Sequence, residues 1–124
     1  MNAITATELE LLECFGAEPV LAEPEIPWCY TDATYTFEVD GLPVSFTVNP
    51  SYRDIRLVVS RKSRPFYELK AIGVDDVRIL DFPGCDVFEI WLSAKEWLRI
   101  QIRPAFNMIH GFEKLPSWTG VADI

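Results

Sequence analysis

The sequence predicts an α+β fold, in which one N-terminal helix packs on an antiparallel, hairpin-rich sheet of about seven strands. Apolar residues recur at helical spacing near the N-terminus, and from Thr34 onward they alternate with polar residues with a period of two. Turn-forming dipeptides separate the alternating runs. A strongly bent sheet or a small sandwich is the alternative arrangement. With 124 residues and an apolar fraction of 49%, we expect one domain over residues 1–124.

The first predicted element is a helix over about residues 5–15. Thr5 or Thr7 can cap its start, and a glutamate follows each of them after three residues, at Glu8 and Glu10, as a capping box requires. Gly16 is suited to end the helix. The apolar stripe predicted to face the core is formed by Leu9, Leu12 and Phe15, with Leu11 beside them.

An extended linker is predicted over residues 17–33, because Pro19, Pro24 and Pro27 exclude a long helix. It is expected to wrap around the body of the protein. The side chains expected to anchor it are those of Val20, Leu21, Ile26 and Trp28.

The antiparallel sheet is predicted over residues 34–112, followed by an irregular tail over residues 116–124. Asp40-Gly41 is a strong signal for a two-residue hairpin turn. This turn pairs apolar residues with one another on both strands, which supports the register. The predicted pairs are Val39 with Leu42, Phe37 with Val44, and Tyr35 with Phe46.

A second hairpin is predicted from residues 87–92 and 97–103, joined by a three-residue loop at Ala94-Lys95-Glu96. One face of this hairpin is apolar, and the other carries charged and aromatic residues. The predicted pairs are Leu92 with Leu98, Ile90 with Ile100, Phe88 with Ile102, Trp91 with Arg99, and Glu89 with Gln101.

The charge of the chain is divided unevenly along its length. The first Lys or Arg is Arg53, so that residues 1–52 carry −9 and residues 53–124 carry +1, for a net charge of −8. A field of this sign attracts basic surfaces and repels nucleic acid and anionic lipid. The sequence has no apolar run of ~18 residues that could span a membrane. Residues 1–5 also lack the start of a secretory signal, so we expect a cytoplasmic protein.

No catalytic motif or metal-ligand spacing is recognised, so we expect neither an enzyme nor a cofactor or metal site. The single histidine, His110, has no partners at triad spacing. The three cysteines form no CxxC pair and are interpreted as reduced thiols, mostly buried. They are Cys14, Cys29 and Cys85. The clustered aspartates are interpreted as turn residues: Asp75, Asp76, Asp81 and Asp86.

The leading functional hypothesis is an acidic, non-enzymatic protein-binding surface. Ordinary solvated faces mix both signs of charge, whereas residues 8–25 contain six glutamates and no basic residue. Amphipathic aromatic residues would anchor the partner. The predicted partner-binding residues are Glu8, Glu10, Glu13, Glu18, Glu23, Glu25, Trp28, Tyr30 and Trp91.

Two alternatives remain open from the sequence. The first is a small-ligand-binding domain or enzyme in which Arg99 or Arg103 clamps an anion and Glu89 is their partner. A cross-strand ion pair on an exposed face is the structural interpretation of the same residues. The second alternative is a structural or assembly subunit that pairs through its sheet.

Several segments resemble small uncharacterised bacterial proteins. They are Phe15-Gly16-Ala17-Glu18-Pro19, Pro27-Trp28-Cys29-Tyr30, Asn49-Pro50-Ser51-Tyr52-Arg53-Asp54 and Ile102-Arg103-Pro104. Several small acidic proteins of this kind are immunity proteins of bacterial toxin systems. The resemblance implies a protein that neutralises a partner, and it transfers no functional residue. The one-sided charge and the missing catalytic motifs extend this hypothesis to a basic toxin domain, such as a nuclease, as the partner.

Overall fold

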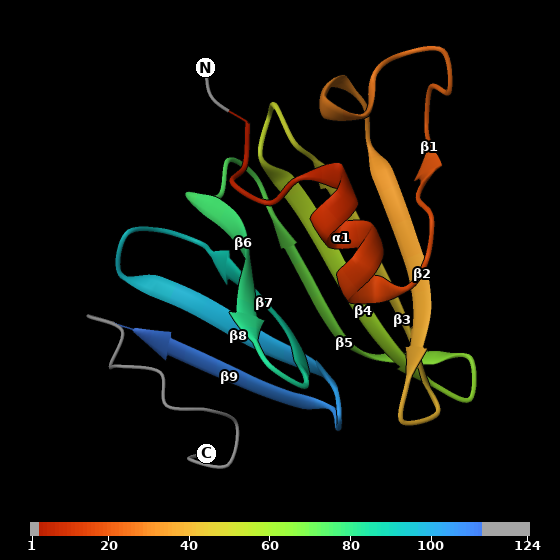
Figure 1. Ribbon diagram of the computed structural model, residues 1–124, viewed down its shortest axis with the longest axis vertical. Helices are drawn as coiled ribbons and strands as arrows, with labels where there is room; N and C mark the ends of the chain where they lie inside the picture. The colour runs from red at the N-terminus through yellow and green to blue at the C-terminus, as the bar shows by residue number, and fades with distance from the viewer. Residues whose placement is uncertain (1–2, 113–124) are drawn as a thin grey trace.

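The computed structural model describes residues 3–112, which form one α-helix, one short 3-10 helix and nine strands (Figure 1). Helix α1 spans Glu8–Phe15, and the 3-10 helix spans Trp28–Tyr30. The predicted irregular tail, residues 116–124, lies outside the described range. The strands are β1 (Val20–Leu21), β2 (Ala33–Val39), β3 (Leu42–Asn49), β4 (Asp54–Arg61), β5 (Arg64–Ala71), β6 (Asp76–Phe82), β7 (Cys85–Trp91), β8 (Glu96–Arg103) and β9 (Asn107–Phe112).

The strands within residues 3–112 form two antiparallel sheets, in the orders β1-β2-β3-β4-β5 and β6-β7-β8-β9. The α+β class and the antiparallel hairpins are confirmed, whereas the prediction of one sheet of about seven strands was wrong. The chain leaves the first sheet after β5 and enters the second at β6, through a turn at Gly73 with a φ of +64°. In the sequence this crossing has the same turn signal as a hairpin. The alternation of apolar residues shows which face of a strand is buried, but it does not show which strand is its hydrogen-bonding partner.

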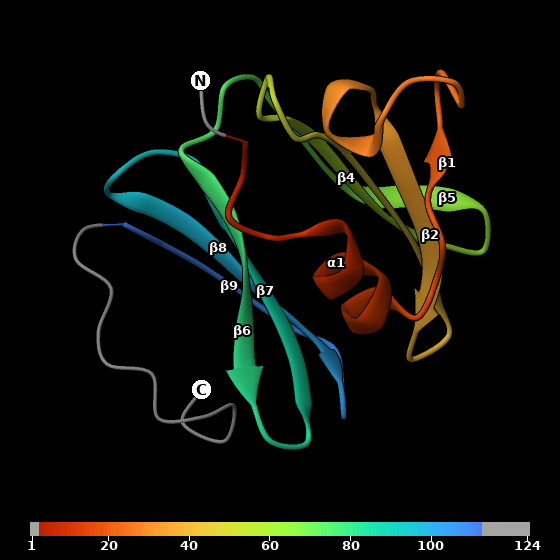
Figure 2. The same cartoon turned by 45° about the horizontal axis from the view of Figure 1, so that its top comes forward.

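Helix α1 lies between the two sheets, which face one another across the core (Figure 2). The Phe15 ring has its centroid 5.1 Å from that of Tyr35 in the five-stranded sheet and 5.1 Å from that of Phe88 in the four-stranded sheet. Phe46 and Phe88 also meet directly across the sheets, at 5.3 Å. Burial of one such ring contributes roughly 1.5–3 kcal/mol, so the helix helps to hold the sheets together.

The capping box of α1 forms at Thr7 and Glu10. The Glu10 amide donates to Thr7 Oγ1 at 3.1 Å, and the Thr7 amide donates to Glu10 Oε1 at 2.9 Å. Gly16 ends the helix in the left-handed conformation. The helix begins later than residue 5 because Thr5 is used elsewhere: its amide and hydroxyl donate to the Asp76 carboxylate at 2.7 and 2.5 Å.

The segment 17–33 is a hook rather than a wholly extended linker. Its first part forms β1, in which Val20 pairs with Thr34 and Leu21 with Ala33 of β2. The chain then turns through the 3-10 helix before β2 begins. Pro24 follows shortly after β1 in the sequence, and a proline has no amide hydrogen to donate to a neighbouring strand. Prolines mark the loop, but nothing local to it identifies β2 as the partner of β1.

The register of the first hairpin is confirmed. Asp40 and Gly41 have φ values of 51° and 79°, as a two-residue type I′ turn requires. The three predicted apolar pairs all occur: Val39 with Leu42, Phe37 with Val44, and Tyr35 with Phe46.

The register of the second predicted hairpin was wrong by two residues. Phe88 pairs with Ile100, Ile90 with Leu98, and Glu89 with Arg99. The turn lies one residue earlier than predicted: the Leu92 and Ser93 amides donate to the Glu96 carbonyl, and Ser93 Oγ accepts from the Lys95 and Glu96 amides at 3.2 and 3.1 Å. A shift by two keeps every side chain on its predicted face, so the apolar pattern could not reveal it.

Candidate partner-binding surface

The acidic segment, residues 8–25, runs along α1 and into the hook that follows. All six of its glutamates are exposed, and none takes part in an ion pair with another described residue. Their side chains therefore present negative charge to solvent without internal compensation. These are Glu8, Glu10, Glu13, Glu18, Glu23 and Glu25.

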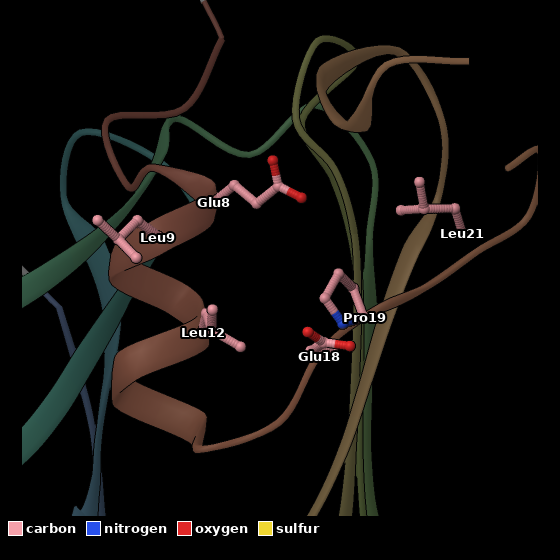
Figure 3. Close-up of a pocket in the computed structure, with 6 residues that line it drawn as sticks. All are labelled: Glu8, Leu9, Leu12, Glu18, Pro19 and Leu21. Atoms are coloured by element: carbon pink, nitrogen blue, oxygen red, sulfur yellow. The ribbon is translucent and has the colours of Figure 1, made fainter. Parts of the chain in front are cut away.

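A groove separates α1 from β1, and we call it the α1–β1 groove. It has a volume of about 380 Å³ and is lined by Glu8, Leu9, Leu12, Glu18, Pro19 and Leu21. Figure 3 shows the Glu8 side chain extending from the helix, with Glu18 and Pro19 on the opposite wall. The helix supplies one wall because residues four apart, such as Glu8 and Leu12, lie on the same side of a helix. The hook supplies the other wall, and the pairing of β1 with β2 holds the hook in this position.

The predicted core stripe of α1 was wrong for Leu9 and Leu12. The buried side of the helix is formed by Leu11, Cys14 and Phe15, whereas Leu9 is 62% exposed. Leu12 is half-buried and lines the α1–β1 groove with Leu9. The apolar part of this groove was missed in the sequence. Two features of the sequence could have indicated it. The leucines of the helix are interleaved with glutamates, and the helix has more apolar positions than one buried side needs.

A second groove, the α1–β6 groove, lies on the other side of the helix. It has a volume of about 230 Å³ and contains four carboxylates, those of Glu10, Glu13, Asp81 and Asp86. Glu10 is engaged in the capping box, and Asp86 accepts from Arg103 Nε at 2.5 Å. Half of the carboxylates in this groove are therefore already bound by the protein itself.

Arg103 and Cys14 meet at the end of α1. Arg103 Nη2 donates to the Cys14 carbonyl, and a cation at this end of a helix interacts favourably with the helix dipole. The Cys14 thiol is buried. Burial, together with the negative charge of Asp86, raises the pKa of this thiol to about 12, although the charge of Arg103 opposes the shift. The prediction of mostly buried thiols holds for Cys14 and was wrong for Cys29 and Cys85, which are half-buried.

The predicted aromatic anchors do not form one cluster. Tyr30 is 64% exposed, at the far end of the hook. Trp28 is half-buried, and its Nε1 donates to the Tyr35 hydroxyl at 2.9 Å, so it fastens the hook to β2. Trp91 lies on the face of the four-stranded sheet opposite the core-facing Phe88, and its Nε1 donates to Glu89 Oε1 at 3.0 Å. The structure therefore places Trp91 apart from the acidic segment.

The three residues of the alternative anion site are divided between two places. Arg99 Nε and Nη2 both donate to Glu89 Oε2, at 2.9 and 2.8 Å. The exposed fractions of Glu89 and Arg99 are only 2% and 4%, so the pair is buried rather than exposed. Arg103 lies instead beside Asp86 and the end of α1. The Glu89 carboxylate thus already supplies an anionic partner to Arg99.

The remaining candidate residues have structural partners. His110 Nε2 lies 2.8 Å from Glu96 Oε2 on the neighbouring strand. Asp76 binds Thr5 and Asp86 binds Arg103, as described above. Within residues 3–112, no three His, Cys, Asp or Glu side chains are grouped so that they could hold a metal ion. The one α-helix of this range is too short to cross a bilayer.

Comparison with known proteins gives one informative match. No protein-family model and no curated protein matches the sequence. Among solved structures, a chain of the contact-dependent growth inhibition toxin–immunity protein complex from Klebsiella pneumoniae 342 has a TM-score of 0.71 and is 22% identical. The match covers 90% of this chain and 98% of that chain. It is consistent with the resemblance to immunity-type proteins seen in the sequence. This chain therefore has the fold of a chain found in a toxin–immunity protein complex.

Proposed function

We propose that this protein is a non-enzymatic, cytoplasmic immunity protein that binds and neutralises a basic toxin domain. The observation that carries the proposal is the acidic segment, whose six exposed glutamates have no ion pair with other described residues. Uncompensated charge of one sign costs stability through self-repulsion, so a binding role is a physical reason to keep it.

The acidic segment can act first on the rate of association. Opposite charges on two proteins steer their encounter and raise the association rate, and salt weakens the effect. A toxin that cleaves or binds nucleic acid needs cations for phosphate groups, and these cations would meet the glutamates. Carboxylates lodged in such a cleft would exclude the phosphates of the substrate.

The charge also favours one of the two roles in the neighbouring complex. That complex contains a toxin and an immunity protein. A net charge of −8 repels nucleic acid, the substrate of a nuclease toxin, and attracts the basic surface such a toxin needs. The immunity role therefore fits the charge of this chain better than the toxin role does.

The experiment requires a toxin domain encoded beside this protein in the source genome, and we expect one to be present there. We expect the purified chain to bind that domain and to restore growth of cells that express it. Association should slow as salt rises from 0.01 to 0.15 M, over which the Debye length falls from about 30 to about 8 Å. The proposal fails if the chain neither binds the domain nor protects the cells. Protection with a salt-independent association rate would keep the immunity role and reject electrostatic docking.

A further inference from the structure

The α1–β1 groove combines two kinds of surface that one long cationic side chain would satisfy together. Its apolar lining comes from Leu9, Leu12, Pro19 and Leu21, and its carboxylates come from Glu8 and Glu18. The two carboxylates belong to opposite walls, one on the helix and one on the hook (Figure 3). An apolar ligand alone would leave both carboxylates without a cationic partner, and a small cation would leave the apolar lining exposed to water.

The carboxylates of this groove are available to a partner. No hydrogen bond or ion pair between described residues engages the side chain of Glu8 or Glu18. In the α1–β6 groove, by contrast, Glu10 caps the helix and Asp86 binds Arg103. Of the two grooves beside α1, the α1–β1 groove is thus the one in which neither carboxylate has a structural task.

We infer that the α1–β1 groove receives one arginine or lysine side chain of the partner protein. The aliphatic stem lies along the leucines and Pro19, and the cationic head faces Glu8 and Glu18. Long cationic side chains bury their stems on apolar surface while the charge stays at a polar edge. Arginine fits best, because its planar fork can bind carboxylates through two hydrogen bonds. The volume of about 380 Å³ is large enough for such a side chain. This inference rests on the proposed function and adds the chemical identity of the contact.

A probe that imitates an arginine side chain tests the groove without the partner. The probe is n-hexylguanidinium, compared with methylguanidinium, which lacks the stem, and with n-hexanol, which lacks the charge. Amide chemical shifts of the isotope-labelled protein report both the affinity and the place of binding. We expect n-hexylguanidinium to shift the amides of residues 8–21 and to bind at least about fivefold more tightly than either control.

Matched variants separate the groove from the charge of the segment. In E8Q/E18Q, n-hexylguanidinium should bind about fivefold more weakly, because both carboxylates are neutralised. The control E23Q/E25Q removes the same charge from the same segment outside the groove and should bind the probe as the parent protein does. L9S keeps the charge and reduces the apolar lining, and it should weaken the probe by about threefold. Circular dichroism verifies that each variant is folded.

The inference is overturned if n-hexylguanidinium leaves residues 8–21 unshifted, or if E8Q/E18Q and E23Q/E25Q weaken it equally. Failure of the groove differs visibly from failure of the proposed function. If the toxin domain binds E8Q/E18Q as tightly as E23Q/E25Q, the groove is not its contact, and the immunity role stands. If the probe binds as expected but the chain neither binds nor neutralises the toxin domain, the proposed function is wrong.

Discussion

The indole ring of Trp97 fills the space beside Gly111 on the neighbouring strand. The two residues are opposite one another in the β8–β9 pair. A Cβ atom at position 111 would lie 2.2 Å from Cζ2 of Trp97, far inside the contact distance of two carbon atoms. Only 5% of Trp97 is exposed to solvent, so the ring cannot move aside freely. Glycine at this position is therefore required by packing.

Replacing Gly111 with alanine should destabilise the protein by about 1–3 kcal/mol, the usual cost of overpacking a filled site. The free energy of unfolding, measured by chemical denaturation, gives the effect. In a Trp97→Leu background the same Gly111→Ala change should cost much less, because the ring that it strikes is gone. An equal cost in both backgrounds would show that the strain lies in the backbone of β9 and not in the contact.

The buried pair of Glu89 and Arg99 gives a second prediction. Glu89→Ala removes the buried carboxylate that accepts from Arg99 Nε and Nη2, and it should cost about 3–5 kcal/mol of unfolding free energy. The matched control is Glu68→Ala in the Arg56–Glu68 pair, in which the Arg56 side chain is 56% exposed and the Glu68 side chain 45%. That change should cost less than about 1 kcal/mol, because solvent already screens the exposed pair. Similar losses for both variants would mean that burial does not set the strength of the pair.

The same pair shows why register limits prediction from sequence. The first hairpin was predicted correctly because Asp40-Gly41 fixes the loop at two residues, and the loop length fixes every pair. In the second hairpin the position of the turn depends on Ser93, whose hydroxyl accepts hydrogen bonds from the two amides of Lys95 and Glu96. No composition rule reveals that choice. The resulting shift by two kept the faces, so that the predicted register placed Gln101 instead of Arg99 opposite Glu89.

The candidate site was predictable in its charge and not in its shape. Glutamates are almost always exposed, and their run in residues 8–25 was visible in the sequence. The α1–β1 groove requires β1 to pair with β2, and it requires α1 to lie between two sheets. Both arrangements depend on contacts distant in the chain. The role of Leu9 followed from them, and helical spacing alone placed that residue in the core.

Cys14 should resist alkylation in the folded protein. Burial and the charge of Asp86 raise the pKa of its thiol to about 12, against the opposing charge of Arg103. At pH 8 the reactive thiolate is then on the order of one part in ten thousand. Mass spectrometry after iodoacetamide treatment should find Cys14 unmodified until denaturant is added. Cys29 and Cys85 are less buried and provide internal controls. Modification of Cys14 at the rate of the other two would contradict this.

Asp76 should make stability depend on acid. Burial alone would raise the pKa of Asp76, but hydrogen bonds from Thr5, Arg78 and the Val77 amide outweigh it and lower the pKa below its ordinary value of 3.8. A lowered folded-state pKa stabilises the protein above the ordinary value, and this stability is lost as pH falls through the folded-state pKa.

The variant for this test is Asp76→Asn, which cannot ionise. Its deficit in unfolding free energy should be largest near neutral pH and should shrink as pH falls below about 4. Denaturation curves of both proteins across this range give the difference. The control is Asp75→Asn, which removes the neighbouring, exposed carboxylate. A deficit for Asp76→Asn that stays constant down to about pH 2 would show that the hydrogen bonds do not distinguish the ionised form.

Neutralising the exposed face of α1 should slow the association with the toxin domain. In the triple variant Glu8→Gln, Glu10→Gln and Glu13→Gln, three charges are removed, while glutamine at position 10 can still complete the capping box. The association rate at low salt should fall by about tenfold, and its dependence on salt should flatten, because steering comes from the summed field. Stopped-flow or surface-based kinetics at several salt concentrations measure both quantities.

The control removes the same number of charges elsewhere, through Glu38→Gln, Glu68→Gln and Asp75→Asn, all exposed positions outside the acidic segment. Net charge alone would make the two triple variants equal, whereas docking through α1 makes the first one slower. If neither the rate nor its salt dependence differs from the parent protein, α1 is not the surface that meets the toxin.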